Sequence, residues 1–349
     1  MRFERRESTS VLLSVLAPLG ALAASFIISA GIIAWSGADP ISAYRHIFLG
    51  AFGTRFAMTE TLTRTVPLIL TGLAVTVAFR ARLWNIGAEG QLYAGAVLAV
   101  VLGSGTLAWP AYLLVPFLFL TGAIAGALCL LGPTLLKTRL GVDEVVTTLL
   151  LNFVILLAVS ALLDGPLKDP SAMGWPQSYP VLDELRLPLL MRASRLHVGI
   201  VLALALVVAV WFIVNKTIWG YEIRAVGANP IGARFAGLPI GGAMVRVALL
   251  SGGLAGIAGV TEVLGPKGDL TIDLSPGYGY SGIVVAMLAV LHPLGVPPAA
   301  LFVAAMFVGA DAMSRALAVP SYIAEVITSI ALLTMLVAVM LARYRIRRS

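Results

Sequence analysis

The sequence has little of the chemistry that enzymes use. It holds a single cysteine, Cys129, so no disulfide can form within the chain and no cage of thiolates is available for a metal ion. Its three histidines are scattered over different connections and run ends, and it contains neither a G-x-x-x-x-G-K-[ST] phosphate loop nor an H-E-x-x-H zinc motif. We therefore expect no autonomous ATPase, no catalytic residue, no metal site and no cofactor.

Charged residues are also scarce. Asp, Glu, Lys and Arg make up 12% of the 349 residues, whereas 59% are hydrophobic and the mean hydropathy is +0.97. So much apolar surface exceeds what one soluble core could bury, which means that the chain needs lipid as its solvent. The net charge of +7 does not indicate a nucleic-acid partner, because the Lys and Arg residues lie in short gaps between apolar runs rather than in one patch.

The apolar runs predict an all-α, polytopic helix bundle, since one membrane span takes roughly 20 residues. A first set of runs comprises Val11–Trp35, Leu62–Phe79, Ile86–Leu102, Trp109–Leu136 and Val142–Leu163. A second set comprises Val198–Val214, Gly242–Leu264, Tyr278–Leu291, Pro298–Leu317 and Tyr322–Leu341. The first run follows a basic N-terminus, as in a signal peptide, but its length fits a retained span. We predict about ten spans.

Every second connection between the runs is basic, as expected for loops on the cytoplasmic side, except 292–297, which holds only His292 and is assigned to that side by parity. The basic positions are Arg2, Arg5, Arg6, Arg80, Arg82, Lys137, Arg139, Lys216, Arg224, Arg234, Arg343, Arg345, Arg347 and Arg348. The long connection from Asp164 to Arg195 has balanced charges and is expected outside. Both termini are therefore predicted to be cytoplasmic.

Two blocks of four runs follow one another along the chain and enter the membrane from opposite sides, which is the topology of an inverted repeat. The second run of each block is its shortest and opens with glycines, at 85–91 and 276–282, a feature that points to a transport pathway. We expect a single transmembrane domain over 1–349. Its parts are a first span with an external segment (1–61), the first repeat (62–163), an external loop with the sixth span and a cytoplasmic loop (164–241), and the second repeat with a basic tail (242–349).

A polar stripe lies at the start of the third run. Asn85 and Glu89 are one helical turn apart, and Tyr93 extends the same face. A carboxylate without a partner is costly in lipid, so Glu89 should face protein or water. We take these three residues and Asn152, deeper in the fifth run, as candidates that line the solute pathway, although for the Asn152 amide a hydrogen bond to a neighbouring helix is somewhat favoured.

Structural roles compete with the pathway hypothesis for the carboxylates. Glu89 could pair with Arg80 or Arg82 near the cytoplasmic end of its run. Asp143 and Glu144 begin the fifth run, where acidic residues favour the positive end of a helix dipole, so we favour that role over solute binding.

The connection between the sixth and seventh runs predicts a short helix outside the membrane, at 230–236. Its start and stop signals are Asn229 as the cap, Pro230 as the first residue, and Gly237 with Pro239 at the end. Ile231 and Phe235 lie at i and i+4 on one face, with Arg234 beside them. A short helix with an apolar face needs a partner. The chain's own membrane ends or lipid headgroups could supply one, but the segment is too short for stable interfacial anchoring, so docking to another protein is favoured.

Three segments carry a resemblance to a known family. They are Trp84–Gln91 (WNIGAEGQ), Gly141–Thr148 (GVDEVVTT) followed by Asn152, and Arg224–Asn229 (RAVGAN). Together they resemble permeases of bacterial ABC importers for nucleosides and simple sugars, which are related to branched-chain amino acid permeases. The resemblance covers nearly the whole chain.

The resemblance implies a translocation subunit of the bacterial inner membrane, with a nucleoside as the favoured solute and a simple sugar next. The implied partners are a cytoplasmic ABC ATPase, a second permease subunit (homologous or identical), an extracytoplasmic solute-binding protein and the lipid bilayer. The RAVGAN motif resembles a loop that contacts the ATPase, although the fuller EAA pattern of other import permeases is absent. The expected coupling residues are Glu222, Arg224, Asn229, Ile231, Arg234 and Phe235.

An ion-coupled secondary transporter is the main alternative, because inverted repeats and broken helices are common in that class. Such a transporter needs ligands for its coupling ion at mid-membrane depth. The central parts of the predicted spans hold almost no carboxylates, so we favour the ATP-driven importer.

Overall fold

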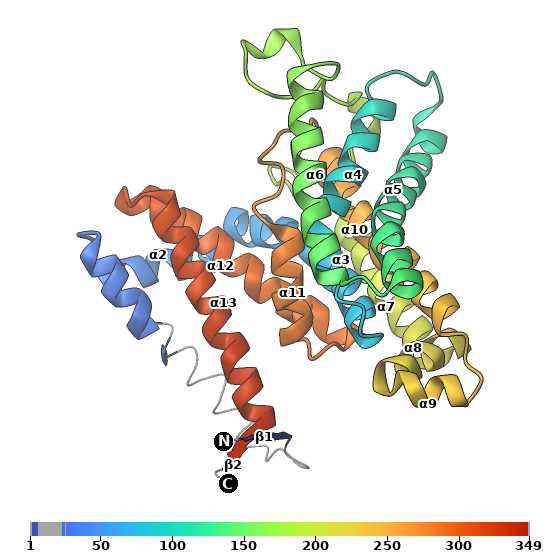
Figure 1. Cartoon of the computed structure of the whole chain (residues 1–349). Coiled ribbons are helices and arrows are strands. Elements are labelled where there is room, and N and C mark those ends of the chain that lie inside the picture. Colours follow the sequence, from blue (N-terminus) through green and yellow to red (C-terminus); the bar gives the residue numbers. More distant parts are fainter. Residues whose placement is uncertain (1, 6–22, 25, 348–349) are drawn as a thin grey trace. The chain divides into compact units, whose positions relative to one another are not determined.

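Figure 1 shows a computed structural model that describes residues 2–5, 23–24 and 26–347. The chain divides into two compact units, one formed by Met1–Thr61 with Leu301–Ser349 and the other by Leu62–Ala300. The divisions fall inside two helices, α3 (Arg55–Arg80) and α12 (Val296–Leu317).

The first unit contains α2 (Pro40–Phe52), α13 (Ser321–Arg343) and an antiparallel strand pair, β1 (Arg2–Arg5) with β2 (Tyr344–Arg347). Helix α2 starts where the Asp39 carboxylate accepts a hydrogen bond from the Ser42 backbone N–H at 2.8 Å, which is a helix cap. The buried core of this unit comprises Ile33, Ala43, Ile47, Ala310, Met313, Val319, Ala324 and Ile327. Sequence reasoning missed α2, which lies in the segment expected to be external.

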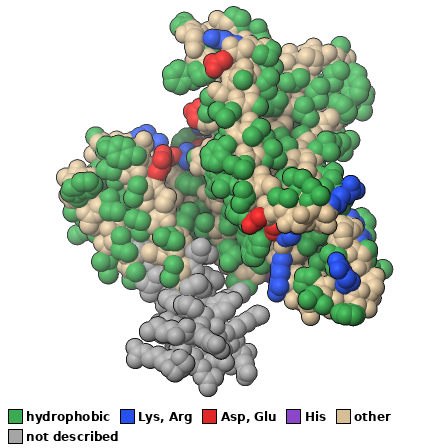
Figure 2. Space-filling view, viewed as in Figure 1, with side chains coloured by type: hydrophobic (Ala, Val, Ile, Leu, Met, Phe, Trp, Pro, Cys, Tyr) green, Lys and Arg blue, Asp and Glu red, His purple; other side chains and the backbone are tan. Residues whose placement is uncertain are grey.

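The second unit holds the rest of α3 together with the remaining helices. These are α4 (Ala88–Gly103), α5 (Ala111–Leu140), α6 (Glu144–Asp164), α7 (Gly199–Lys216), α8 (Ile218–Ala228), α9 (Pro230–Phe235), α10 (Ile240–Glu262), the π-helical turn η3 (Val263–Lys267) and α11 (Tyr278–Leu288), with short 3₁₀ turns at Pro170–Ala172, Asp183–Leu185 and Pro293–Gly295. Helices α3 and α10 are mostly buried, whereas only a third or less of the apolar stretches of α5, α6 and α7 is buried. The exposed surfaces are largely apolar, and Figure 2 shows apolar side chains over most of the viewed face.

Glycines allow α10 to approach α5 very closely. A Cβ added to Gly256 would lie 2.1 Å from the carbonyl oxygen of Gly122, and one added to Gly126 would lie 2.2 Å from that of Gly252. Any larger side chain would push the two backbones apart. These four glycines therefore serve the close packing of α10 against α5.

Six of the described helices are long and apolar enough to cross a membrane, or seven if the helix Phe26–Trp35 and α2, bent by 115°, form one span. Three shorter apolar helices are α4, α11 and Ser321–Thr334. An all-α membrane bundle is therefore confirmed, while the number of ten spans and the inverted repeat stay predictions. Residues 11–22 and 25 of the first predicted span lie outside the described residues.

Candidate functional site

The starts of α4 and α11 lie against each other. The Glu89 carboxylate of α4 accepts a hydrogen bond from the backbone N–H of Gly279, in the first turn of α11, at 2.6 Å. A Cβ on Gly279 would lie only 2.2 Å from the backbone nitrogen of Glu89, so this approach requires glycine. The two glycine-rich segments found in the sequence thus form one site.

The Asn85 amide just before α4 is fully buried and uses all its hydrogen-bonding capacity. Its Oδ1 accepts from the Gly87 N–H at 2.9 Å and from the Gln91 amide at 2.9 Å. Its Nδ2 donates to Gln91 at 3.0 Å and to the hydroxyl of Ser251, on α10, at 3.1 Å. Ser251 in turn donates to the Ala74 carbonyl of α3 at 2.7 Å. One amide therefore links the start of α4 to two buried helices.

The Tyr93 hydroxyl ties α4 to the segment that precedes α11. It donates to the Ile272 carbonyl oxygen and accepts from the Ser275 backbone N–H at 3.2 Å. Tyr93 is 1% exposed, and its hydroxyl both donates and accepts a hydrogen bond. It therefore holds this segment against the first half of α4.

Asn152 connects α6 to the start of α4 and to α11. Its Oδ1 accepts from the Gly90 N–H at 2.8 Å, and its Nδ2 donates to the Ile86 carbonyl at 2.8 Å and to the Tyr280 hydroxyl at 3.3 Å. The sequence left open whether this amide bonds a neighbouring helix, and the structure shows that it does.

The four predicted pathway residues thus gather around the start of α4, where each is buried and hydrogen-bonded within the chain: Asn85, Glu89, Tyr93 and Asn152. The alternative partners of Glu89 have other contacts, since Arg80 donates to the Leu291 carbonyl and Arg82 to the Ala228 carbonyl. No group of metal-binding side chains is found among the described residues.

Asp143 and Glu144 lie at the start of α6, as expected, and both make contacts within the chain. Asp143 caps α6 by accepting from the Val145 N–H at 2.8 Å. Glu144 forms an ion pair with Lys137 at the end of α5 and accepts from the Trp84 N–H at 3.2 Å. These contacts join α5 and α6 to the segment that leads into α4.

The connection after α7 forms two helices, of which sequence reasoning found the second. The Asn229 side chain accepts from the N–H groups of Ile231 and Gly232, both at 3.1 Å, and so caps α9. The helix ends at Phe235, one residue before the predicted end, and Gly237 follows with a positive φ of 75°. Ile231 is 70% exposed and Phe235 is 89% exposed, so the described part of the chain leaves both predicted apolar positions of α9 largely uncovered.

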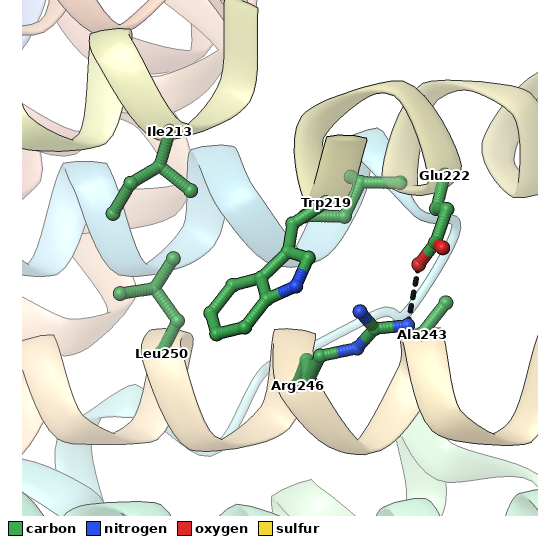
Figure 3. A pocket seen from close by; sticks show the side chains of 7 residues that line it. Ile213, Trp219, Glu222, Ala243, Arg246 and Leu250 are labelled. Atoms are coloured by element: carbon green, nitrogen blue, oxygen red, sulfur yellow. Dashed lines mark hydrogen bonds and ion pairs between the residues drawn. The ribbon is translucent and has the colours of Figure 1, made fainter. Parts of the chain in front are cut away.

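Helix α8, which sequence reasoning missed, is clamped to α10 (Figure 3). The Glu222 carboxylate of α8 forms an ion pair with Arg246 of α10, and the Arg246 guanidinium lies 5.4 Å from the ring centroid of Trp219. Arg224 is also held within the chain, since it donates to the Val214 carbonyl at the end of α7. A signal for Arg246 was available in the sequence, because an arginine inside an apolar run needs a partner.

Comparison with known proteins gives the same class over nearly the whole chain. The family model described as branched-chain amino acid transport system, permease component, matches residues 57–341. The glucose ABC transporter permease protein TsgB13 of Haloferax volcanii is 36% identical over 318 residues, which cover 88% of this chain and 83% of that protein. The guanosine ABC transporter permease protein NupP of Bacillus subtilis is 36% identical over 326 residues, covering 91% and 92%. The nucleoside ABC transporter permease protein NupB of Lactococcus lactis is 30% identical over 323 residues, covering 90% and 88%. No solved structure gives a significant match.

Proposed function

The chain belongs to the family of branched-chain amino acid transport system permease components, and from this premise we propose that it is the membrane-spanning subunit of an ATP-driven importer for a nucleoside. Its relatives are permease subunits, which move a solute and do not catalyse a reaction. Two of the relatives above are named for guanosine or nucleoside transport and one for glucose, so a simple sugar is the next solute. Nothing observed favours ion coupling.

The proposed complex contains a cytoplasmic ABC ATPase, a second permease subunit and an extracytoplasmic solute-binding protein. In this arrangement both termini and helices α8 and α9 face the cytoplasm. The basic residues Lys216, Arg224 and Arg234 around these two helices support that orientation.

The exposed face of α9 is the observation that carries the ATP-driven proposal. The helix is capped at its start, yet Ile231 and Phe235 project without cover from the chain. An apolar pair on a rigid two-turn helix suits a groove on a partner protein. We place the ATPase there, with Arg234 at the edge of the contact.

The clamp on α8 would carry motion from the ATPase into the membrane. Glu222 and Arg246 connect α8 to α10, and α10 contacts the start of α4 through Ser251 and Asn85. A shift of α8 would therefore reach the polar site through one continuous helix. In this scheme Glu222 and Arg224 position the coupling helices, whereas Ile231 and Phe235 make the contact.

Alternating access would open and close the site at the starts of α4 and α11. In the structure, the polar groups of Glu89, Asn85, Tyr93 and Asn152 bond within the chain, so solute or water must replace some of these bonds when the site opens. A solute with several hydroxyls and ring nitrogens can replace these hydrogen bonds at nearly no cost in enthalpy. Lipid cannot replace them, so contact with lipid would leave buried polar groups unsatisfied. A nucleoside fits this requirement.

Reconstitution of the complex into vesicles tests the proposal. The co-purified ATPase and the solute-binding protein are included, and uptake of labelled guanosine, glucose and leucine is compared with and without ATP. We expect ATP-dependent uptake of guanosine above the other two solutes. Uptake that requires an ion gradient and is indifferent to ATP would refute the proposal.

A further inference from the structure

An open apolar groove of about 630 Å³ lies between α5 and α6, two helices that contact each other. Figure 1 shows the course of both helices. Its walls include Leu128, Gly132 and Leu136 from α5, and Leu150 with Val154 from α6. A Cβ added to Gly132 would meet nothing within 4 Å, so the missing side chain deepens the groove. The groove takes no part in the polar site around α4.

Both helices are long and apolar enough to cross a membrane, which places the groove against lipid or another membrane helix. Leu150 is 57% exposed and Val154 is 60% exposed, so the chain itself leaves these side chains open. An occupant must therefore be apolar over the length of the groove.

On α5, a cation follows the last residue that lines the groove by about one helical turn. Gly132, Leu136 and Arg139 follow one another at spacings of four and three residues and share a stripe of α5. Arg139 is exposed, and no hydrogen bond or ion pair within the described part of the chain reaches it. Lys137 beside it is paired with Glu144, and the nearby Asp143 carboxylate caps α6. Among the described residues, the guanidinium is thus the charge near this end of α5 for which the structure shows no partner.

We propose that the groove binds an acyl chain of an anionic phospholipid and that Arg139 pairs with its phosphate. An apolar slot that ends in an unpaired cation complements both parts of such a lipid. An apolar helix from a second permease subunit would use the slot alone, whereas an anionic phospholipid uses the slot and the cation together. This inference rests on the membrane location of the chain and not on how transport is driven.

Photo-cross-linking tests the proposal on the full chain in vesicles of mixed phosphatidylglycerol and phosphatidylcholine. A diazirine is placed in an acyl chain of one lipid or the other, and cross-linked peptides are mapped by mass spectrometry. We expect labelling within 128–136 and 147–155, with phosphatidylglycerol favoured about fivefold, because its headgroup has a net negative charge whereas the choline of phosphatidylcholine neutralises the phosphate. Arg139→Gln should abolish the preference, Arg139→Lys should retain it, and the matched control Lys216→Gln, at the end of α7, should leave it unchanged.

Cys129 supplies a second readout, because it lines the groove and is the only cysteine in the chain. A membrane-permeant maleimide should alkylate it more slowly in vesicles that contain phosphatidylglycerol, and Arg139→Gln should remove that protection. Equal cross-linking by the two lipids, or a preference that survives Arg139→Gln, would overturn the proposal. A disulfide formed between Cys129 residues of two copies on oxidation would instead assign the groove to a second permease subunit.

Discussion

The Glu89 carboxylate accepts a hydrogen bond from the backbone N–H of Gly279 at 2.6 Å, and this contact joins the starts of two short apolar helices. A charged acceptor and a helix N-terminus suit each other, since the first N–H groups of a helix lack partners inside it. The contact explains how a carboxylate is kept among apolar helices. It also makes Glu89 the residue whose loss should separate α4 from α11.

Replacing Glu89 tests whether the contact serves transport. Glu89→Ala leaves the N–H of Gly279 buried without an acceptor, which costs about 1–3 kcal/mol, whereas the amide oxygen of Glu89→Gln can still accept. We expect uptake per assembled complex to fall strongly in the alanine variant and less in the glutamine variant. Uptake is measured in cells and normalised to the complex recovered from their membranes. Loss of the protein from the membrane would favour a structural role, and unimpaired uptake in Glu89→Ala would contradict the pathway role.

The polar stripe shows what sequence can and cannot supply. Helical periodicity predicted Asn85, Glu89 and Tyr93 on one face. The structure finds all three at one site, although Asn85 lies before the first residue of α4 and not on the helix itself. Their hydrogen-bond partners could not be predicted from the sequence, because Ser251 lies 166 residues from Asn85 and Gly279 lies 190 residues from Glu89 along the chain. Periodicity describes one helix, while such contacts depend on how distant helices pack.

Close packing of α10 against α5 can be tested by adding one methyl group. Gly256→Ala would bring a Cβ within 2.1 Å of the Gly122 carbonyl oxygen, so we expect the free energy of unfolding of the purified protein to drop by about 1–3 kcal/mol and its melting temperature to fall. Gly241→Ala, on the same helix, meets nothing within 4 Å and is the matched control. The solubilised protein is heated to a series of temperatures and then run on a size-exclusion column. The temperature at which half of the monodisperse peak is lost gives the melting temperature. Equal behaviour of the two variants would show that the helices can separate without cost.

The clamp between α8 and α10 predicts a charge-swap rescue. Arg246→Glu places two carboxylates together, and Glu222→Arg places two cations together, so each should lower both stability and uptake. The double variant restores an opposite pair, and we expect an interaction free energy of about 1 kcal/mol or more from the thermal midpoints of the four proteins. If the two effects simply add, the ion pair does not couple the helices.

His197, beside the start of α7, predicts a dependence of stability on pH. Its ring is buried and accepts from the Gly199 N–H at 3.1 Å, and this burial lowers its pKa from 6.5 to about 4. Between these values the unfolded chain binds a proton that the folded chain does not. The free energy of unfolding should therefore fall as pH drops from 6.5 towards 4, by at most about 3 kcal/mol, and His197 should contribute no slope above that range. Thermal midpoints against pH for the wild type and His197→Gln isolate this contribution, and parallel curves would contradict it.

The helix α9 could be predicted because its start and stop signals lie within the segment itself. A cap, an N-terminal proline and a following glycine are all encoded within a few residues, so the helix at 230–236 was found to within one residue. The same reasoning missed α8, which Thr217 caps through its hydroxyl at 3.2 Å, and missed the pairing of Glu222 with Arg246. The pairing depends on the packing of α8 against α10, and the sequence pattern of neither helix contains it.

The exposed face of α9 gives the sharpest test of the proposed ATPase contact. Phe235 is 89% exposed in the chain, so Phe235→Asp should cost the permease itself almost nothing. If the ring is buried in a groove of the ATPase, the introduced carboxylate must be desolvated there at a cost of several kcal/mol. ATPase co-purification, uptake and solute-stimulated ATP hydrolysis should then fall together while membrane insertion persists.

Two further variants separate the contact from the helix that presents it. Phe235→Leu keeps an apolar side chain and should retain most co-purification. Asn229→Ala removes the cap, at a cost of about 1 kcal/mol to the helix, and should therefore weaken ATPase retention less than Phe235→Asp does. Because Phe235 makes so little contact within its own chain, a loss confined to Phe235→Asp points to the partner surface. Normal ATPase retention and normal uptake in Phe235→Asp would place the ATPase contact elsewhere.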